Sequence, residues 1–170
     1  MFALACLEMS TPYRGLQGLD MLKSHKIPAP TQVMESMITS GKPKLTGLKV
    51  LVIDDSKTIR RTAETLLTKE GCEVFTAVDG FDALSKIADH QPDIVFVDIM
   101  MPRLDGYQTC ALIKKNTRFH QTPVVMLSSK DGLFDRARGR MVGSDQYLTK
   151  PFTKESLLKA VGTHVKAAAH

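Results

Sequence analysis

The sequence predicts an α/β fold in which a doubly wound, five-stranded parallel sheet carries helices on both faces. Two observations lead to this prediction. Between residues 48 and 165, short apolar runs alternate five times with amphipathic segments. The runs are apolar throughout instead of alternating with polar residues, which is typical of parallel strands that helices cover on both sides. Right-handed crossovers between such strands then produce a three-layer sandwich.

The first strand-helix unit begins with the apolar run LKVLVI at residues 48–53. Ser56 is well placed to cap a helix over residues 56–69, and Gly71 is a typical terminator for it. The residues that we expect on the buried face of this helix are Ile59, Ala63, Leu66 and Leu67.

The second and third units follow the same pattern. A strand is expected over residues 72–77, and Asp79 is expected to open the next helix. The run DIVFV at residues 93–97 predicts the third strand, and a helix near residues 106–115 follows it. In the helix that Asp79 opens, the residues expected to point inward are Phe81, Leu84, Ile87 and Ala88.

The last two units complete the predicted sheet. The run PVVML at residues 123–127 predicts the fourth strand, with a helix over residues 133–142 after it. Residues 146–149 form a short fifth strand, and residues 153–165 a closing amphipathic helix.

The chain is expected to have three parts. Proline and glycine recur through residues 1–47, so we expect a poorly ordered extension there, with short helices considered near residues 16–22 and 32–39. Residues 48–166 form the compact domain, and residues 167–170 a C-terminal tail.

Composition indicates an ordinary globular protein, with 43% hydrophobic and 24% charged residues in a chain of 170. The net charge of +5 is spread along the chain and leaves nucleic-acid binding open without favouring it. Cys6, Cys72 and Cys110 have no metal-like spacing and suit apolar filling in a reducing cytoplasm. No stretch approaches the roughly 20 apolar residues of a membrane span.

Polar residues follow four of the predicted strands. Asp54 and Asp55 follow the first strand, Asp98 the third, Ser128 the fourth and Lys150 the fifth. The carboxyl ends of parallel strands meet at one edge of a sheet, where the sites of such folds lie. An Asp-Asp-Ser sequence taken alone is better explained as a helix cap or turn. The joint pattern favours a site in which three carboxylates need a cation, and Mg²⁺ suits oxygen ligands.

The remaining groups of this pattern suit phosphoryl chemistry. A lysine and a hydroxyl are donors for an anion held against the metal. Aspartate is a competent nucleophile for phosphoryl transfer and forms an aspartyl phosphate.

The segments VLVIDDSKTIRR, DIVFVDIMMPRLDG, PVVMLSSK and YLTKPF resemble the receiver domain of two-component response regulators. The spacings agree with this resemblance: 43 residues separate Asp55 from Asp98, 30 separate Asp98 from Ser128, and 22 separate Ser128 from Lys150. The resemblance covers residues 48–165 and implies a flavodoxin-like receiver fold.

The resemblance also implies roles for single residues. Asp98 is the expected phosphoacceptor, which takes its phosphoryl group from a histidine kinase. Asp54, Asp55 and Asp98 are the expected Mg²⁺ ligands, together with the backbone carbonyl of Met100. Lys150 is expected to pair with the phosphoryl oxygens.

Further implied roles concern switching. Ser128 is the expected switch hydroxyl, Tyr147 stands where the family keeps a rotating aromatic residue, and Pro151 is a candidate for a cis peptide bond. Met100 and Lys130 stand two residues beyond Asp98 and Ser128, at positions that influence the hydrolytic water in the family.

The segments IDDSKTIRRTAETLL, MMPRLDGYQTCALIK and GSDQYLTKPF are similar to the single-domain receivers of type IV pilus chemosensory systems, which control twitching motility. This similarity implies a cytoplasmic protein, a hybrid chemosensory histidine kinase, and downstream pilus or motility proteins that bind through helix 133–142 and its neighbours. The exposed residues considered for that contact are Phe134, Arg136, Arg138 and Arg140, for which a solvated basic stripe is the other interpretation.

The chain ends 20 residues after Lys150, so we expect protein contact as its output, with no DNA binding, no membrane insertion and no turnover as an enzyme. Four alternatives stay open. A chemotaxis or phosphorelay receiver would act on another target. A haloacid-dehalogenase-type phosphatase needs a second aspartate where Met100 stands. A flavodoxin-like flavin carrier has to bind phosphate at an acidic loop. A DNA-binding regulator rests on the net charge alone.

Overall fold

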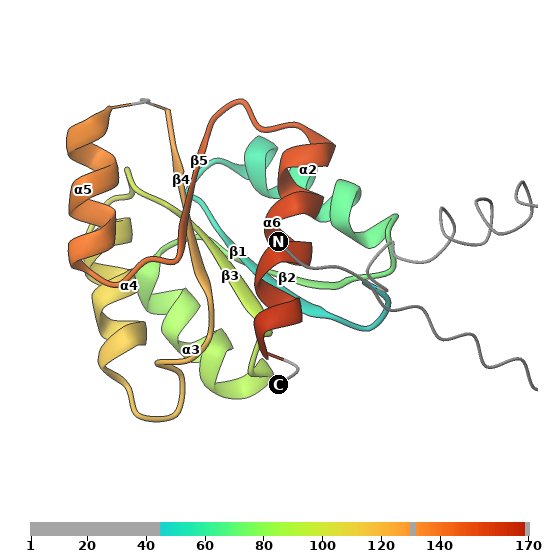
Figure 1. The fold of residues 1–170 in the computed structure, drawn as a ribbon, viewed down its shortest axis with the longest axis horizontal. Helices are drawn as coiled ribbons and strands as arrows, with labels where there is room; N and C mark the ends of the chain where they lie inside the picture. The colour runs from blue at the N-terminus through green and yellow to red at the C-terminus, as the bar shows by residue number, and fades with distance from the viewer. Residues whose placement is uncertain (1–44, 130–131, 169–170) are drawn as a thin grey trace, which may run out of the picture. The chain divides into compact units, whose positions relative to one another are not determined.

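The computed structural model describes residues 45–129 and 132–168 of the chain, with no account of the side chains after Val165 (Figure 1). The helices considered near residues 16–22 and 32–39, Cys6 and Lys130 lie outside the described residues. The proposed extension, domain and tail boundaries therefore stay predictions.

The described residues form five strands and five helices in strict alternation, and none of these helices is both long and apolar enough to cross a membrane. The strands make one parallel sheet in the order β2-β1-β3-β4-β5. This topology confirms the predicted fold class. In chain order, the elements are β1 (Lys49–Ile53), α2 (Lys57–Thr68), β2 (Glu73–Ala77), α3 (Gly80–His90), β3 (Ile94–Asp98), α4 (Gly106–Lys115), β4 (Val124–Ser128), α5 (Leu133–Met141), β5 (Gln146–Thr149) and α6 (Lys154–Ala168).

The strand register brings the carboxyl ends of four strands to one edge of the sheet. Ile53 of β1 pairs with Val97 of β3, so Asp54 and Asp98 follow in step. Asp98 in turn pairs with Leu127 of β4, and Ser128 pairs with Thr149 of β5. The order of the strands reverses between β1 and β3, which is the position where sheets of this type bind ligands.

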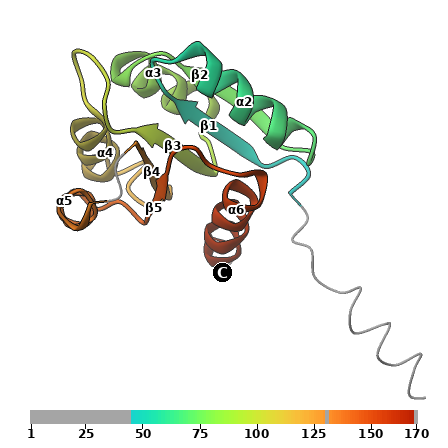
Figure 2. The same ribbon diagram turned by 90° about the horizontal axis from the view of Figure 1, so that it is seen from above.

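Each face of the sheet carries its own apolar core, because neighbouring residues of a strand point to opposite faces. Leu51, Val95 and Met126 pack with α3 and α4, and Val52, Phe96 and Val125 pack with α2 and α6. Figure 2 shows α6 on one side of the sheet and α4 and α5 on the other. The all-apolar strands therefore serve two cores at once, as their composition predicted.

One free cysteine is buried in each core. Cys110 lies on the α3 and α4 side and Cys72 on the α2 and α6 side. Burial raises the pKa of both thiols, and that of Cys110 reaches about 11. Both side chains act as small apolar filling in the described part of the chain.

The predicted inward face of α3 is wrong by part of a turn. Phe81 is 57% exposed and Ala88 is also exposed, whereas Ala83 and Ile87 are buried. The close approach of Gly80 to the chain around α4 sets the rotation of the helix, since a Cβ there would lie 2.3 Å from the Thr109 hydroxyl oxygen. Phe81 is large and apolar, but the contacts of the neighbouring Gly80 fix the rotation of α3 and leave Phe81 on the exposed side.

A second close approach sets the start of α4 against the end of β3. The Gly106 amide donates to the Ile99 carbonyl at 3.0 Å, and a Cβ on Gly106 would lie 2.2 Å from the backbone oxygen of Asp98. Asp105 and Gln108 complete a capping box at the same helix end. The backbone of Asp98 is therefore held by the helix that follows it.

This contact predicts that Gly106→Ala destabilises the protein by about 3 kcal/mol, because the added methyl group meets backbone atoms that cannot rotate away. Urea unfolding measures the loss. Gly132→Ala is the matched control: its Cβ would meet only the flexible Asp135 carboxylate, at 3.3 Å, so we expect a loss below about 1 kcal/mol. Equal losses in the two variants would contradict the packing argument.

Candidate functional site

Three aspartates meet at the carboxyl edge of the sheet. Asp54 and Asp55 follow β1, and Asp98 is the last residue of β3. One carboxylate oxygen from each of the three lies within 4.8 Å of the others. Asp54 and Asp98 are buried, and Asp55 is exposed. The structure thus brings together the three acids that the strand ends predicted.

Lys150 bridges the two buried carboxylates. Its Nζ donates to Asp54 Oδ2 at 2.5 Å and to Asp98 Oδ1 at 2.8 Å, and its side chain is 12% exposed. Its backbone amide donates to the Ser128 carbonyl at 2.6 Å, which continues the pairing of β5 with β4. The peptide bond between Lys150 and Pro151 is cis.

Burial and charge oppose each other at this cluster. Burial raises the pKa of the Asp98 carboxyl, and the nearby Asp54 charge adds to the rise, against hydrogen bonds from Lys150 and the Met100 amide. Burial acts to lower the pKa of Lys150, but its hydrogen bonds to Asp54 and Asp98 outweigh burial and raise it. One ammonium therefore faces three carboxyl groups, and the cluster favours a further cation.

Local hydrogen bonds fix the loop after β1. The Ser56 amide donates to Asp54 Oδ1 at 2.9 Å, and Ser56 also caps α2. Arg60 Nη1 donates to the backbone oxygens of Asp54 and Asp55 at 2.5 and 3.1 Å. The sequence pattern predicts no role for Arg60. The one clue to this role in the sequence is that Arg60 lies on the first turn of the helix that Ser56 caps, within reach of the loop before that helix.

The acids and Lys150 line an open cavity of about 520 Å³. Met100 and Ser129 border it, whereas Ser128 is buried at the end of β4 and is not among the lining residues. The residue that borders the cavity is therefore Ser129, which follows the predicted switch residue Ser128. Its lining residues are Asp54, Asp55, Ser56, Ile59, Asp98, Met100, Ser129, Lys150 and Pro151.

Tyr147 lies apart from this cavity. It is half-buried on β5, and the Arg136 guanidinium of α5 lies 5.4 Å from its ring centre. Together with Arg136 and Arg140 it borders a separate hollow of about 290 Å³. The structure therefore groups Tyr147 with α5 and not with the carboxylates.

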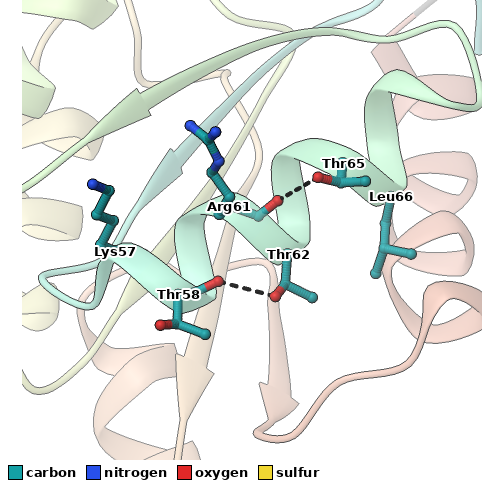
Figure 3. Close-up of a pocket in the computed structure, with 6 residues that line it drawn as sticks. All are labelled: Lys57, Thr58, Arg61, Thr62, Thr65 and Leu66. Carbon is teal, nitrogen blue, oxygen red and sulfur yellow. Dashed lines mark hydrogen bonds between the residues drawn. The ribbon is translucent and has the colours of Figure 1, made fainter.

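A larger hollow, of about 580 Å³, lies along one face of α2 (Figure 3). The Thr62 and Thr65 hydroxyls donate to the carbonyls of Thr58 and Arg61, at 2.9 and 2.8 Å. The other lining residues are Lys57 and Leu66, so the hollow holds no carboxylate and no buried polar group. We therefore take the carboxylate cavity as the candidate site.

The donor set of the carboxylate cavity fits Mg²⁺. Carboxylate and backbone oxygens are the ligands of hard divalent cations, and no histidine or thiol joins the cluster among the described residues. Among the described residues, the Lys150 ammonium is the one cation that the buried Asp54 and Asp98 oxygens share. A divalent ion would balance the remaining charge.

Comparisons with known proteins agree with this geometry. Residues 50–162 match the family model described as the response regulator receiver domain. The chain is 78% identical to Protein PilG of Pseudomonas aeruginosa over 119 residues, which cover 70% of this chain and 88% of that protein.

Solved structures give the same result. Chemotaxis protein CheY4 of Vibrio cholerae is 33% identical with a TM-score of 0.67, over 69% of this chain and 98% of that one. The receiver domain of the Francisella response regulator 1452 is 36% identical with a TM-score of 0.67, over 72% of this chain and 99% of that one.

The raised pKa of Asp98 predicts a pH-dependent effect of Asp98→Asn on stability. Because the folded-state pKa lies above the ordinary value of 3.8, the unfolded chain loses this proton first, and wild-type stability falls as pH rises through that interval. We expect Asp98→Asn to be more stable than wild type at pH 7, and no more stable below pH ~4.

Urea unfolding in the presence of EDTA at several pH values measures this difference. The control is Asp89→Asn, which removes an exposed carboxylate of α3 and should change stability by less than about 0.5 kcal/mol at every pH. A constant difference between Asp98→Asn and wild type across pH would contradict the charge argument.

Proposed function

The chain belongs to the response regulator receiver domain family, and from this membership we propose that it is a single-domain response regulator that accepts a phosphoryl group on Asp98 from a histidine kinase. The observation that carries the proposal is the position of the Asp98 carboxylate, which lines the cavity beside two further acids and 2.8 Å from Lys150. Residues 48–166 form the receiver in this proposal, preceded by an extension over residues 1–47 and followed by a tail at 167–170.

The transfer follows from these groups. An Asp98 carboxylate oxygen forms a bond to phosphorus while the bond from phosphorus to the donor imidazole nitrogen breaks, and the nitrogen keeps the electron pair. The Lys150 ammonium balances charge on the phosphoryl oxygens. Because Lys150 already contacts Asp98, little rearrangement is needed to reach the attached group.

The proposed cofactor is Mg²⁺, held by Asp54, Asp55, Asp98 and the backbone carbonyl of Met100. When bound, the ion supplies positive charge that lowers the repulsion between the phosphoryl group and the carboxylates. The residues of the chain orient the acceptor: Arg60 and Ser56 hold the loop of Asp54 and Asp55, and Gly106 holds the backbone of Asp98.

Phosphorylation adds about −1.5 to −2 charges beside Asp98 and supplies strong acceptors. In the proposed switch, Ser128 turns its hydroxyl toward the phosphoryl group and Tyr147 moves inward to fill the space. Tyr147 lies beneath Arg136, so its movement changes the surroundings of α5. The changed face then consists of α5, β5 and α6.

The output we propose is protein contact that controls type IV pilus twitching motility, with a hybrid chemosensory kinase as donor. It is supported by the 78% identity to Protein PilG and by the exposed Phe134 and arginines of α5. We place the protein in the cytoplasm, with no DNA or membrane partner, and propose slow self-dephosphorylation instead of enzymatic turnover. A chemotaxis or phosphorelay receiver is the second candidate, which the similarity to a chemotaxis protein favours.

Phosphotransfer tests the central proposal. Purified histidine domains of a panel of kinases, and a small phosphodonor such as acetyl phosphate, are mixed with the chain and MgCl₂. We expect radioactive labelling of wild type and none of Asp98→Ala, whereas Asp89→Ala keeps wild-type labelling because Asp89 is an exposed residue of α3. Labelling of Asp98→Ala at the wild-type level, or none of wild type by any donor, would overturn the proposal.

Met100 predicts a long-lived phosphoprotein. Its side chain is 72% exposed at the rim of the cavity and has no group that orients an attacking water. Met100→Asn adds a donor and an acceptor there, so we expect the acyl phosphate to decay several-fold faster. The half-life of the labelled protein measures this change. Met100→Leu is the matched control and should keep the wild-type half-life, since its side chain is also apolar and of similar size.

A further inference from the structure

The geometry points to Arg103 and Asp79 as a positioning pair that fixes the loop at residues 99–105 and thereby sets the affinity of the carboxylate cluster for Mg²⁺. This inference rests on the proposed metal site and adds two residues to it that neither line the cavity nor contact the three acids.

The base of this loop is fixed by the backbone. The Ile99 amide donates to the Leu127 carbonyl at 3.0 Å, and the Gly106 amide donates to the Ile99 carbonyl at 3.0 Å. Beyond this base, Met100, Pro102 and Arg103 are exposed. Met101 packs into the core on the α3 and α4 side, but the exposed Pro102 and Arg103 need a further contact from outside the loop to hold one position.

Asp79 provides that contact. Its Oδ2 accepts a hydrogen bond from Arg103 Nη2, and its Oδ1 accepts from the Asp82 amide at 2.9 Å. The Asp79 side chain is 6% exposed at the N-terminus of α3, so it is a buried acceptor for an exposed arginine. A charge-assisted bond to a buried carboxylate is among the stronger hydrogen bonds in proteins.

Phe81 lies beside the same arginine. The Arg103 guanidinium lies 5.9 Å from the centre of the Phe81 ring. Phe81, which the sequence placed in the core, is turned outward with α3 and so lies within reach of Arg103. Two side chains of α3 thus hold one side chain of the loop.

The backbone conformation of Arg103 supports the same inference. Its φ of +67° lies in the left-handed region, which is unfavourable for a residue with a Cβ. Such conformations persist where the surroundings over-determine them, and they cluster at functional sites. The bond to Asp79 and the contact with Phe81 are the interactions that hold Arg103 there.

The loop tip connects the pair to the site through Met100. Its amide donates a hydrogen bond to the Asp98 carboxylate, and Met100 borders the cavity three residues before Arg103. A metal ligand tolerates little displacement, and groups that orient ligands change metal affinity by about 10- to 100-fold. A loosened tip would therefore weaken binding without removing any ligand.

The test is an Mg²⁺ titration of the full chain, followed by the amide NMR signals of residues 98–106, together with thermal unfolding. Arg103→Ala removes the pair and keeps the unfavourable φ, whereas Arg103→Gly removes the pair and relieves it. Asp79→Asn keeps an acceptor for the cap of α3 and removes the charge. We expect the Mg²⁺ dissociation constant to rise roughly tenfold in all three variants.

Two comparisons separate positioning from general destabilisation. Arg103→Gly should unfold at a higher temperature than Arg103→Ala and yet bind Mg²⁺ no better, which a purely structural role does not produce. The double variant of Asp79→Asn and Arg103→Ala should bind no more weakly than either single variant. Arg118→Ala is the matched control, because Arg118 lies over the Phe119 ring at 5.3 Å after α4, and it should keep wild-type affinity.

The outcomes distinguish this inference from the proposed function. If wild type binds Mg²⁺ and Asp98 is labelled, but the Arg103 and Asp79 variants bind Mg²⁺ as wild type does, the positioning role is overturned and the phosphoacceptor proposal stands. If wild type binds no Mg²⁺, the positioning role is overturned as well, and phosphotransfer to Asp98 decides the proposed function separately.

Discussion

The bridge from Lys150 to Asp54 and Asp98 is the interaction on which the arrangement of the site depends. A parallel sheet brings the carboxyl ends of β1, β3 and β5 to one edge, and the residues there are two buried acids and one lysine. The buried carboxylates would repel each other without that ammonium. Because Lys150 balances only part of the charge of three acids, the cluster has an excess of negative charge at the sheet edge, where a cation is electrostatically favoured.

Much of the fold and of the site was readable from the sequence. The central strands β1, β3 and β4 are largely apolar on both faces, the limits of all five strands came out within one residue, and the strand ends predicted which acids would meet. The rotation of α3 was not readable, because it depends on what Gly80 touches across the chain. The partners of Arg60 and Arg103 were also missed. Long side chains that bond to backbone oxygens or to a distant carboxylate leave no periodic pattern in a sequence.

Helix α5 is held differently from the other helices of the described chain. Gly139 is its one buried residue, and its ties to the domain are largely polar and aromatic. Tyr107 donates to the Asp135 carboxylate at 3.2 Å, and the Arg138 guanidinium lies 4.4 Å from the Tyr107 ring centre. Burial, with Asp135 beside it, raises the pKa of Tyr107 to about 12, so its hydroxyl stays a donor. A helix with little buried apolar area moves at small cost, which suits the proposed role of α5 in the output.

The two buried cysteines have a practical consequence. Cys110 belongs to the core beneath α3 and α4, and Cys72 to the core beneath α2 and α6. Thiol reagents attack the thiolate, and neither sulfur is reachable or readily ionised while its layer is closed. The rate at which each thiol is alkylated therefore reports how often its own layer opens. The described residues therefore contain one native thiol on each side of the sheet whose alkylation rate reports the opening of that side.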